Sequence, residues 1–281
     1  MLSYRHSYHA GNHADVLKHL VLIQLLRHMA LKDKAFTVVD THAGAGMYSL
    51  ESEHATKLAE HEGGVSRLWH RKDLPAAVAD YVAEVRNLNP DGELRSYPGS
   101  PWLAQRALRE QDRLRLFELH PTDHRQLASY FGHNGKQTIV YADDGFATLK
   151  ALLPPPSKRG LVLIDPSYEL REDYGRVATV LKEGLERFAT GTYAVWYPLL
   201  PKPEARFLPQ KLRTLGGENW LHVTLSVRGP ATDGFGMHGS GMFVINPPWT
   251  LAATLKEVMP WLSSALAENS DGGFTLDFES K

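Results

Sequence analysis

Residues 36–46 read FTVVDTHAGAG, and this stretch indicates the fold. Its first part is a short run rich in β-branched residues, which predicts a buried strand. The strand ends at Asp40 and is followed at once by a turn that contains Gly44 and Gly46. A strand that runs directly into a glycine turn is typical of the first unit of an α/β fold.

Three further segments repeat this arrangement of an apolar run that ends at a carboxylate. They are LRLFE ending at Glu118, TIVYADD ending at Asp144, and LVLID ending at Asp165. Helical patterns lie between them, including residues 101–110 with Ser100 as the predicted N-cap, and residues 174–188. Alternating strands and helices predict a mostly parallel, Rossmann-like sheet.

The rest of the chain extends this sheet. Three later strands are expected, TYAVWYP, LHVTLSVR and GMFVIN, and the last two form an antiparallel hairpin across the glycine-rich stretch 229–241. Residues 12–29 predict an amphipathic helix capped at Asn12. Residues 50–97 show helical patterns and no strand, so we expect one domain over residues 1–281 with a helical subdomain inserted at about 50–97.

The composition is that of an ordinary globular protein. The 281 residues are 43% hydrophobic and 22% charged, the formal net charge is −1, and cysteine is absent. Disulfides and thiolate metal sites are therefore excluded. No apolar stretch has the length of a membrane span, and the first residues lack the apolar run of a secretory signal, so a cytoplasmic location is expected.

The carboxylates predict a ligand site. In an open parallel sheet, ligands bind at the carboxyl ends of the strands, where Asp40, Glu118, Asp144 and Asp165 would converge. A turn without side chains at Gly44 would let a cofactor approach the main chain, although a purely structural turn is the alternative. Ser49 stands where a dinucleotide fingerprint has its third glycine, which disfavours a dehydrogenase. Glu118 would accept hydrogen bonds from ribose hydroxyls or, alternatively, cap the next helix.

The sequence DPSY at 165–168 resembles the [DNS]PP[YFW] signature of amino-methyltransferases. The amino nitrogen of adenine is a poor nucleophile, because its lone pair is delocalised into the ring. The Asp165 carboxylate and the Pro166 carbonyl would accept its N–H groups, and Tyr168 would offer a face on which the base stacks. Ser167 departs from the signature, in which a second proline is usual. An ordinary turn at the end of a strand is the alternative.

A second sequence, NPPW at 246–249, matches the same signature more literally. It follows the expected terminal hairpin strand, so we interpret Asn246 as structural and its prolines as the start of a helix. The chain also has fourteen histidines, among them His9, His13 and His19. No HExxH pattern is present and no third ligand is placed beside them, so no metal is expected.

Basic and aromatic residues suggest where RNA would bind, although a solvated surface is the alternative for each. One group lies near the N-terminus, and the others lie before the DPSY strand and in the following third of the chain. They are Tyr4, Arg5, His6, His9 and Lys18, then Lys158 and Arg159, then Lys202, Arg206, Lys211 and Arg213.

Motifs along residues 1–262 together resemble the ribosomal RNA large subunit methyltransferase J family. They are LSYRHSYHAGNHADVLKH, DTHAGAG, YPGSP, FELHP, ADDGF, LVLIDPSYE, FATGTYAVWYP and GMFVINPPW. The resemblance implies a class I methyltransferase fold with a helical insertion. It further implies methylation of the N6 amino group of one adenine in 23S ribosomal RNA with S-adenosyl-L-methionine.

The same resemblance implies roles for individual residues. Asp165 would be the catalytic residue, and Tyr4 would contact the RNA. The implied cofactor contacts are His19, His42, Ser100, Glu118, Asp144, Gly145 and Asp165. A monomer is expected. The competing hypotheses are a dinucleotide-dependent oxidoreductase and a catalytically silent RNA-binding relative.

Overall fold

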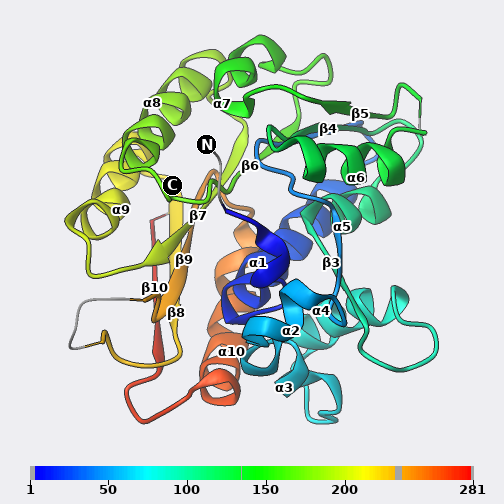
Figure 1. Cartoon of the computed structure of the whole chain (residues 1–281). Coiled ribbons are helices and arrows are strands. Elements are labelled where there is room, and N and C mark those ends of the chain that lie inside the picture. Colours follow the sequence, from blue (N-terminus) through cyan, green and yellow to red (C-terminus); the bar gives the residue numbers. More distant parts are fainter. Residues whose placement is uncertain (1–3, 134, 232–235, 280–281) are drawn as a thin grey trace.

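The computed structural model describes residues 4–133, 135–231 and 236–279, and its centre is one eight-stranded sheet (Figure 1). The strand order is β10-β8-β9-β7-β6-β1-β4-β5. The strands are β1 (Thr37–Asp40), β4 (Arg113–Phe117), β5 (Thr138–Tyr141), β6 (Gly160–Ile164), β7 (Thr192–Leu199), β8 (Trp220–Ser226), β9 (Gly239–Ile245) and β10 (Gly273–Glu279).

Strand direction divides this sheet into two parts. The neighbours from β5 to β7 pair in parallel. Strand β9 is antiparallel to both β7 and β8, and β10 is antiparallel to β8. The predicted α/β sheet and the antiparallel hairpin of β8 and β9 are therefore confirmed. Within the glycine-rich stretch that joins these two strands, residues 232–235 lie outside the described residues.

Helices cover both faces of the sheet. One face packs on α1 (His13–Ala30), α4 (Ala76–Asn87), α5 (Ser100–Ala107), α6 (Pro121–Phe131) and α10 (Trp249–Leu266). The other face packs on α7 (Gly145–Thr148), η3 (Leu149–Leu152), α8 (Glu172–Arg187) and α9 (Pro203–Gly216) (Figure 1). Because side chains alternate along a strand, Val38 joins the first core cluster and Val39 joins the second.

Helix α1 differs from its prediction. Asn12 caps it as expected, because its side chain accepts hydrogen bonds from the amides of Ala14 and Asp15. The helix has no polar face, however, since most of its length is buried between the sheet, α5, α10 and the insertion. The expected amphipathic helix was therefore wrong: a helix that is enclosed over most of its surface carries apolar residues all round, and its polar residues Asp15, Lys18 and His19 are buried with them.

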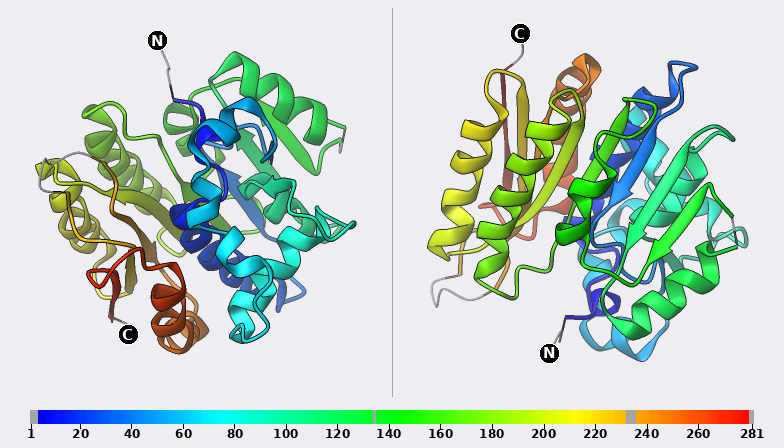
Figure 2. Two further views of the ribbon diagram at one scale, coloured as in Figure 1. Left: turned by 60° about the horizontal axis from the view of Figure 1, so that its bottom comes forward. Right: turned by 90° about the horizontal axis from the view of Figure 1, so that it is seen from above.

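The segment after β1 contains three helices and one 3-10 turn. These are α2 (Glu53–Leu58), η2 (Glu60–Gly63), α3 (Ser66–Trp69) and α4. Two short strands that the sequence did not predict, β2 (Met47–Ser49) and β3 (Ser96–Pro98), pair antiparallel at its base. Figure 2 shows these helices, in cyan, beside the orange-red α10, and α3 and α4 both contact that helix.

Three boundaries also differ from the predictions. Strand β5 ends at Tyr141, so Asp144 lies three residues beyond it as the N-cap of α7. The N-cap of α5 is Gly99, because the Ser100 side chain turns to another partner. Strand β10 was not predicted. Among the described residues, no helix has the length and apolar character that a membrane crossing requires.

Candidate active site

A cavity of about 340 Å³ opens at the carboxyl ends of β1, β4, β6 and β7. Its walls come from the segment before α1, α1 itself, the glycine turn, the start of α5, the turns after β4, β5 and β6, the start of α8 and the end of β7. The predicted residues that line it are Tyr4, His19, His42, Gly44, Ser100, Glu118, Asp144, Gly145, Asp165 and Pro166. Residues far apart in sequence therefore meet where the parallel topology predicts a ligand site.

The glycine turn needs both of its glycines, for different reasons. Gly44 has φ +61°, its amide donates to Oε2 of Glu118 (2.8 Å), and a Cβ there would lie 2.2 Å from the Tyr48 hydroxyl. Gly46 has φ +81°, and a Cβ would lie 2.4 Å from the ring of Phe131. Gly46 does not line the cavity, so of the two glycines only Gly44 exposes main chain to a ligand.

Backbone amides hold Glu118 in place at the end of β4. Oε2 accepts from Gly44, and Oε1 accepts from the amide of His120 (2.6 Å). Burial raises the pKa of Glu118. Each oxygen of a carboxylate has two lone pairs, so both oxygens can accept a further hydrogen bond from a ligand hydroxyl.

On the far side of the cavity, Asp144 caps α7 by accepting from the amide of Phe146 (2.9 Å) and pairs with Arg176. Burial acts to raise the pKa of Asp144, but the hydrogen bond and charge of Arg176 outweigh it and lower the pKa. Gly145 allows close packing, because a Cβ there would lie 2.3 Å from the carbonyl oxygen of Thr41. Asp144 is thus an ionised acceptor on a fixed turn.

Two histidines in the wall, the buried His19 and the half-buried His42, have lowered pKa values that favour the neutral ring. Burial lowers the pKa of His19 to about 3 and that of His42 to about 4. Nδ1 of His19 is hydrogen-bonded to the Tyr97 hydroxyl (2.8 Å), while its Nε2 has no hydrogen-bond partner within the described part of the chain. Nδ1 of His42 is hydrogen-bonded to Oγ1 of Thr41 (2.8 Å). The free Nε2 of His19 is a buried polar atom to which a ligand would supply a partner.

Ser100 and Asp40 form a buried pair behind the glycine turn. The Ser100 hydroxyl donates to Oδ2 of Asp40 (2.6 Å), and Asp40 also accepts from the amide of His42 (3.2 Å). Burial raises the pKa of Asp40 to about 6. Ser100 lines the cavity, whereas Asp40 does not and acts from behind it.

Asp165 is the last member of a chain of polar contacts that begins near the N-terminus. Nζ of Lys18 donates to Oδ2 of Asp165 (2.6 Å) and lies 2.9 Å from Oδ1 of Asp15. Oδ2 of Asp15 contacts Nε2 of His6 (2.9 Å), and Nδ1 of His6 contacts the Tyr4 hydroxyl (2.8 Å). One buried cation therefore links two carboxylates.

The pKa values follow from this pairing. Burial acts to lower the pKa of Lys18, but Asp15 and Asp165 outweigh it and raise the pKa well above its ordinary value. Burial acts to raise the pKa of Asp15, but His6 and Lys18 hold it well below the ordinary value. Burial raises the pKa of Asp165 and Lys18 opposes that rise. Lys18 is buried and held by both carboxylates, and its expected contact with RNA stays a prediction.

Tyr168 does not have the predicted orientation. Its side chain is 3% exposed, its hydroxyl donates to the carbonyl oxygen of Trp196 (2.7 Å), and its ring packs on Tyr174 in the second core cluster. It presents no face to the cavity, so the expected stacking role is not supported. The aromatic side chain of Trp196 lines the cavity instead. Sequence reasoning gave Trp196 no role, because it lies within a strand and its motif, FATGTYAVWYP, supported only the family resemblance.

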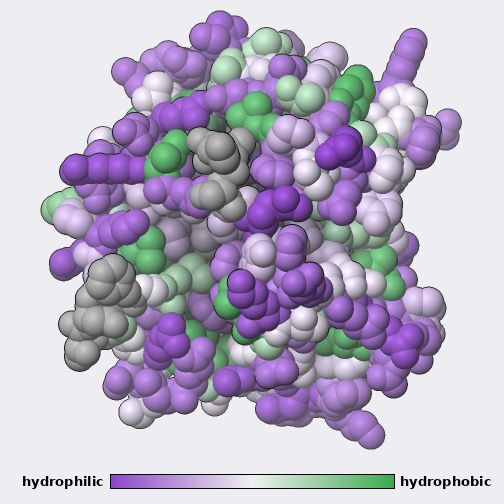
Figure 3. All heavy atoms as spheres, in the orientation of Figure 1, coloured by the Kyte–Doolittle hydropathy of each residue, from purple (hydrophilic) through white to green (hydrophobic). Residues whose placement is uncertain are grey.

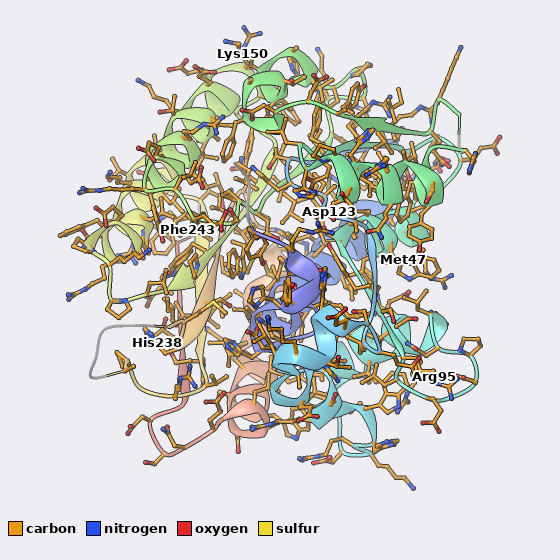
Figure 4. The ribbon with its side chains drawn as sticks, in the orientation of Figure 1. Met47, Arg95, Asp123, Lys150, His238 and Phe243 are labelled. Atoms are coloured by element: carbon orange, nitrogen blue, oxygen red, sulfur yellow. The ribbon has the colours of Figure 1, made fainter. Side chains whose placement is uncertain are left out.

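The N-terminal segment closes one side of the site. Arg5 pairs with Asp123 of α6 (3.3 Å), which Figure 4 labels beside this segment. Tyr4 stacks on His9 with ring centroids 5.4 Å apart. The space-filling view shows mainly hydrophilic residues on this face, with apolar ones scattered between them (Figure 3). Within the described residues, no group of three or more His, Asp or Glu is arranged to hold a metal ion.

This sheet, with its cavity at the carboxyl edge and a carboxylate after β6, defines a Rossmann-like class I methyltransferase. A family model described as "Ribosomal RNA large subunit methyltransferase D, RlmJ" matches residues 33–280. The chain belongs to this family of ribosomal RNA methyltransferases, as the sequence resemblance predicted.

Individual relatives agree with the family assignment. Ribosomal RNA large subunit methyltransferase J of Haemophilus influenzae is 48% identical over 279 residues, which are 99% of each chain. The protein of the same name from Escherichia coli is 48% identical over 278 residues, again 99% of each chain. A crystal structure of a Legionella pneumophila protein, 36% identical, superposes with a TM-score of 0.89 over 97% of this chain and 99% of that one.

Proposed function

We propose that this protein uses S-adenosyl-L-methionine to methylate the N6 amino group of one adenine in 23S ribosomal RNA. The observation that carries this proposal is the turn after β6, where the Asp165 carboxylate and Pro166 line the same cavity as the glycine turn. The names of the relatives, which specify the large ribosomal subunit, support 23S RNA as the substrate. The adenine and its N6 atom are what the resemblance to the methyltransferase J family implies, and the DPSY turn supports an amino group as the acceptor.

The cavity wall fits the proposed cofactor. Gly44 exposes main chain, Glu118 has free lone pairs for ribose hydroxyls, and Nε2 of His19 has no hydrogen-bond partner among the described residues. The remaining residues that would hold the cofactor are His42, Ser100, Asp144 and Gly145. When bound, S-adenosyl-L-methionine supplies a methyl group activated by its sulfonium. The residues of this chain orient the acceptor and handle its protons.

Asp165 orients the acceptor amino group. Lys18 occupies Oδ2, which leaves Oδ1 to accept an N–H of the base, while the Pro166 carbonyl accepts the other N–H. Two acceptors on one amino group localise the nitrogen lone pair and direct it. The Lys18 ammonium also favours the ionised carboxylate, which is the form that accepts. After transfer the nitrogen is acidic, so an ordinary carboxylate is a sufficient base for its proton.

Asp15 and His6 support this arrangement from behind. Asp15 accepts from the amide of Gly11 (2.9 Å), which fixes it at the first turn of α1. With Asp15 fixed, Lys18 has two anionic partners and keeps its position without a ligand. Tyr4, at the end of the chain of contacts, lies where an incoming RNA would meet it.

The remaining parts of the proposal concern the molecule as a whole. We propose that residues 1–281 form one domain with the helices of about 50–97 as an insertion, acting as a cytoplasmic monomer. Two core clusters on opposite faces of one continuous sheet support the single domain. Light scattering of the purified protein measures the oligomeric state.

A methylation assay tests the proposal. Purified protein is incubated with S-adenosyl-L-methionine labelled in its methyl group and with 23S RNA from cells that lack the modification, and the labelled base is then mapped. We expect label at the N6 atom of one adenine. Label on another base or atom contradicts the adenine assignment, and no transfer to any RNA favours the silent relative. Thermal shifts with S-adenosylhomocysteine and with NAD separate this reading from an oxidoreductase.

A further inference from the structure

A second cavity, of about 360 Å³, lies at the opposite end of the parallel strands, where β6 and β7 begin. It is bounded by the end of α1, the residues before β6 and β7, and the NPPW sequence at the start of α10. In the right view of Figure 2, the blue loop after α1 and the orange α10 reach the edge opposite the N-terminus. The methyltransferase site does not account for this cavity or for NPPW.

Trp249 stands at the mouth of this cavity with 84% of its surface exposed. Leu31, 75% exposed, follows the end of α1, whose last residues line the same cavity. An indole ring rarely remains in water when it has apolar surface to pack on. Its exposure here leaves an aromatic face free for a ligand.

The turn that carries Trp249 is rigid. Asn246 has φ +53°, and its side-chain nitrogen donates to the carbonyls of Ala189 (2.8 Å) and Gly191 (2.7 Å). Its side-chain oxygen accepts from Asn219 (3.1 Å). Several bonds therefore hold one strained residue, a situation usual at sites where a side chain must be presented in a fixed position. All its side-chain groups are occupied, so Asn246 is no second clamp for a base.

The cavity wall is basic and contains no carboxylate. Four of its residues are His28, Lys32, Lys158 and Arg159. Arg159 is engaged by the main chain, donating to the carbonyl of Met29 (2.8 Å). Within the described part of the chain, no ion pair involves Lys32 or Lys158, and both are exposed. Burial and the charges of Lys32 and Arg159 lower the pKa of His28, as expected in a positive local field.

We propose that this cavity is a second contact for the RNA substrate, in which an unpaired base stacks on Trp249 and Lys32 and Lys158 neutralise the neighbouring phosphates. This inference rests on the proposed function, since it takes RNA to be the substrate. A base with its phosphates matches both the aromatic face and the charge of the wall. The net charge of −1 provides no global attraction for RNA, so local basic surfaces must supply it.

A protein partner fits the cavity less well. Stable protein interfaces cover about 800 Å² on each side around an apolar centre, whereas here one aromatic ring is surrounded by cations. The distance between the two cavities adds a constraint. The five residues of β6 alone span roughly 15 Å, so only RNA that extends well beyond the target adenine can reach both.

Trp249→Ala tests the inference with two substrates, a long 23S fragment and a short hairpin around the target adenine. For the long fragment, we expect KM to rise about 10-fold and kcat to stay unchanged. For the hairpin, we expect neither KM nor kcat to change. Tyr130→Ala, which removes an aromatic ring that is 50% exposed on α6, is the matched control and should change neither substrate.

The charges are tested separately. The double variant Lys32→Gln, Lys158→Gln should reduce the slope of log affinity against log salt for the long fragment by roughly 1.4, while Lys150→Gln, another exposed lysine, serves as control. An unchanged KM for the long fragment in Trp249→Ala overturns the proposal, and an equal change for both substrates does so as well. If adenosine monophosphate alone binds the wild type and not Trp249→Ala, the site takes free nucleotides instead. Inactivity of the wild type on every RNA would count against the proposed function and not against this contact.

Discussion

The sequences DPSY at 165–168 and NPPW at 246–249 resemble the same signature, yet they lie at opposite ends of the sheet's strands. Each follows a buried strand, and each contains a residue with φ +53°, Tyr168 in one and Asn246 in the other. Strand β6 is parallel to β7 and β9 is antiparallel to it, so their carboxyl ends point in opposite directions. Strand direction, more than the motif, decides which turn faces the cofactor cavity.

Their side chains differ accordingly. The Asp165 carboxylate lines a cavity and is paired with a buried ammonium. The nitrogen and the oxygen of the Asn246 side chain are both hydrogen-bonded to other residues of the protein. The proposed reaction thus belongs to the turns after the parallel strands, whereas the Asn246 side chain stabilises the turn after the antiparallel strand β9. Four substitutions test this division.

The largest effect is expected for Asp165→Asn. The substitution keeps the shape of the side chain but replaces one carboxylate oxygen with an NH2 group. Because Lys18 takes the remaining oxygen as its acceptor, the NH2 group faces the base and cannot accept its N–H. We expect kcat to fall by about 10²- to 10³-fold, as when one preorganised polar group is removed from an active site. Single-turnover methylation measures the fall, and calorimetry with S-adenosylhomocysteine should show cofactor binding preserved. Turnover close to that of the wild type would remove Asp165 from the mechanism.

Asn246→Ala should act on stability. It removes three side-chain hydrogen bonds and places alanine at φ +53°, which together should lower the free energy of unfolding by about 3 kcal/mol. Urea unfolding measures the change, and kcat per folded molecule should be retained. Asn246→Gly is the matched control, because glycine adopts this φ without strain and should lose less. Lost turnover at unchanged stability would show instead that NPPW takes part in the reaction.

A smaller, pH-dependent effect is expected for His222→Gln in the antiparallel part. Nε2 of His222 is hydrogen-bonded to Tyr197 (2.6 Å), and burial lowers the pKa of His222 to about 4. The unfolded chain therefore binds more protons between about pH 4 and 6.5, so stability falls as the pH decreases through this window. In the variant, the loss between pH 7 and 5 should be smaller by about 2 kcal/mol. Exposed His70→Gln is the control and should leave the pH profile of unfolding unchanged.

The smallest effect is expected for Ser167→Pro, which restores the usual proline to the DPSY turn. Ser167 lines the cavity, and no hydrogen bond of its amide or hydroxyl lies within the described residues. Proline should therefore remove no hydrogen bond from the folded protein. Because it restricts the unfolded chain, it should raise the free energy of unfolding by about 0.5 kcal/mol. We expect kcat to change by less than about 3-fold, with Ser167→Ala as control. A large gain in rate would mean that serine impairs the turn.

Much of the sheet could be predicted because its signals are local. The apolar runs before Asp40, Glu118 and Asp165 are strands, and the parallel topology brings their ends together. Strand β10 also had a signal in the sequence, the alternation of Phe274, Leu276 and Phe278. The alternation is short and lies among polar residues, so the strand was not predicted.

Other features depend on contacts between distant residues. Lys18 and Asp165 are 147 residues apart, so nothing near either one marks the pair. Tyr168 carries the expected motif, but packing on Tyr174 and a hydrogen bond to Trp196 turn it inward. The amphipathic prediction for α1 failed in the same way, because the helices that enclose it come from later parts of the chain.

Helix α1 has a consequence for engineering. Asp15, Lys18 and His19 stand on it among Val16, Leu17 and Leu20, which are fully buried, so the same turns serve the reaction and the core. A substitution here that stabilises the core is therefore expected to lower activity, and one that raises activity is expected to lower stability. Directed evolution of this enzyme should therefore leave residues 13–30 untouched and diversify the loops of the cavity rim.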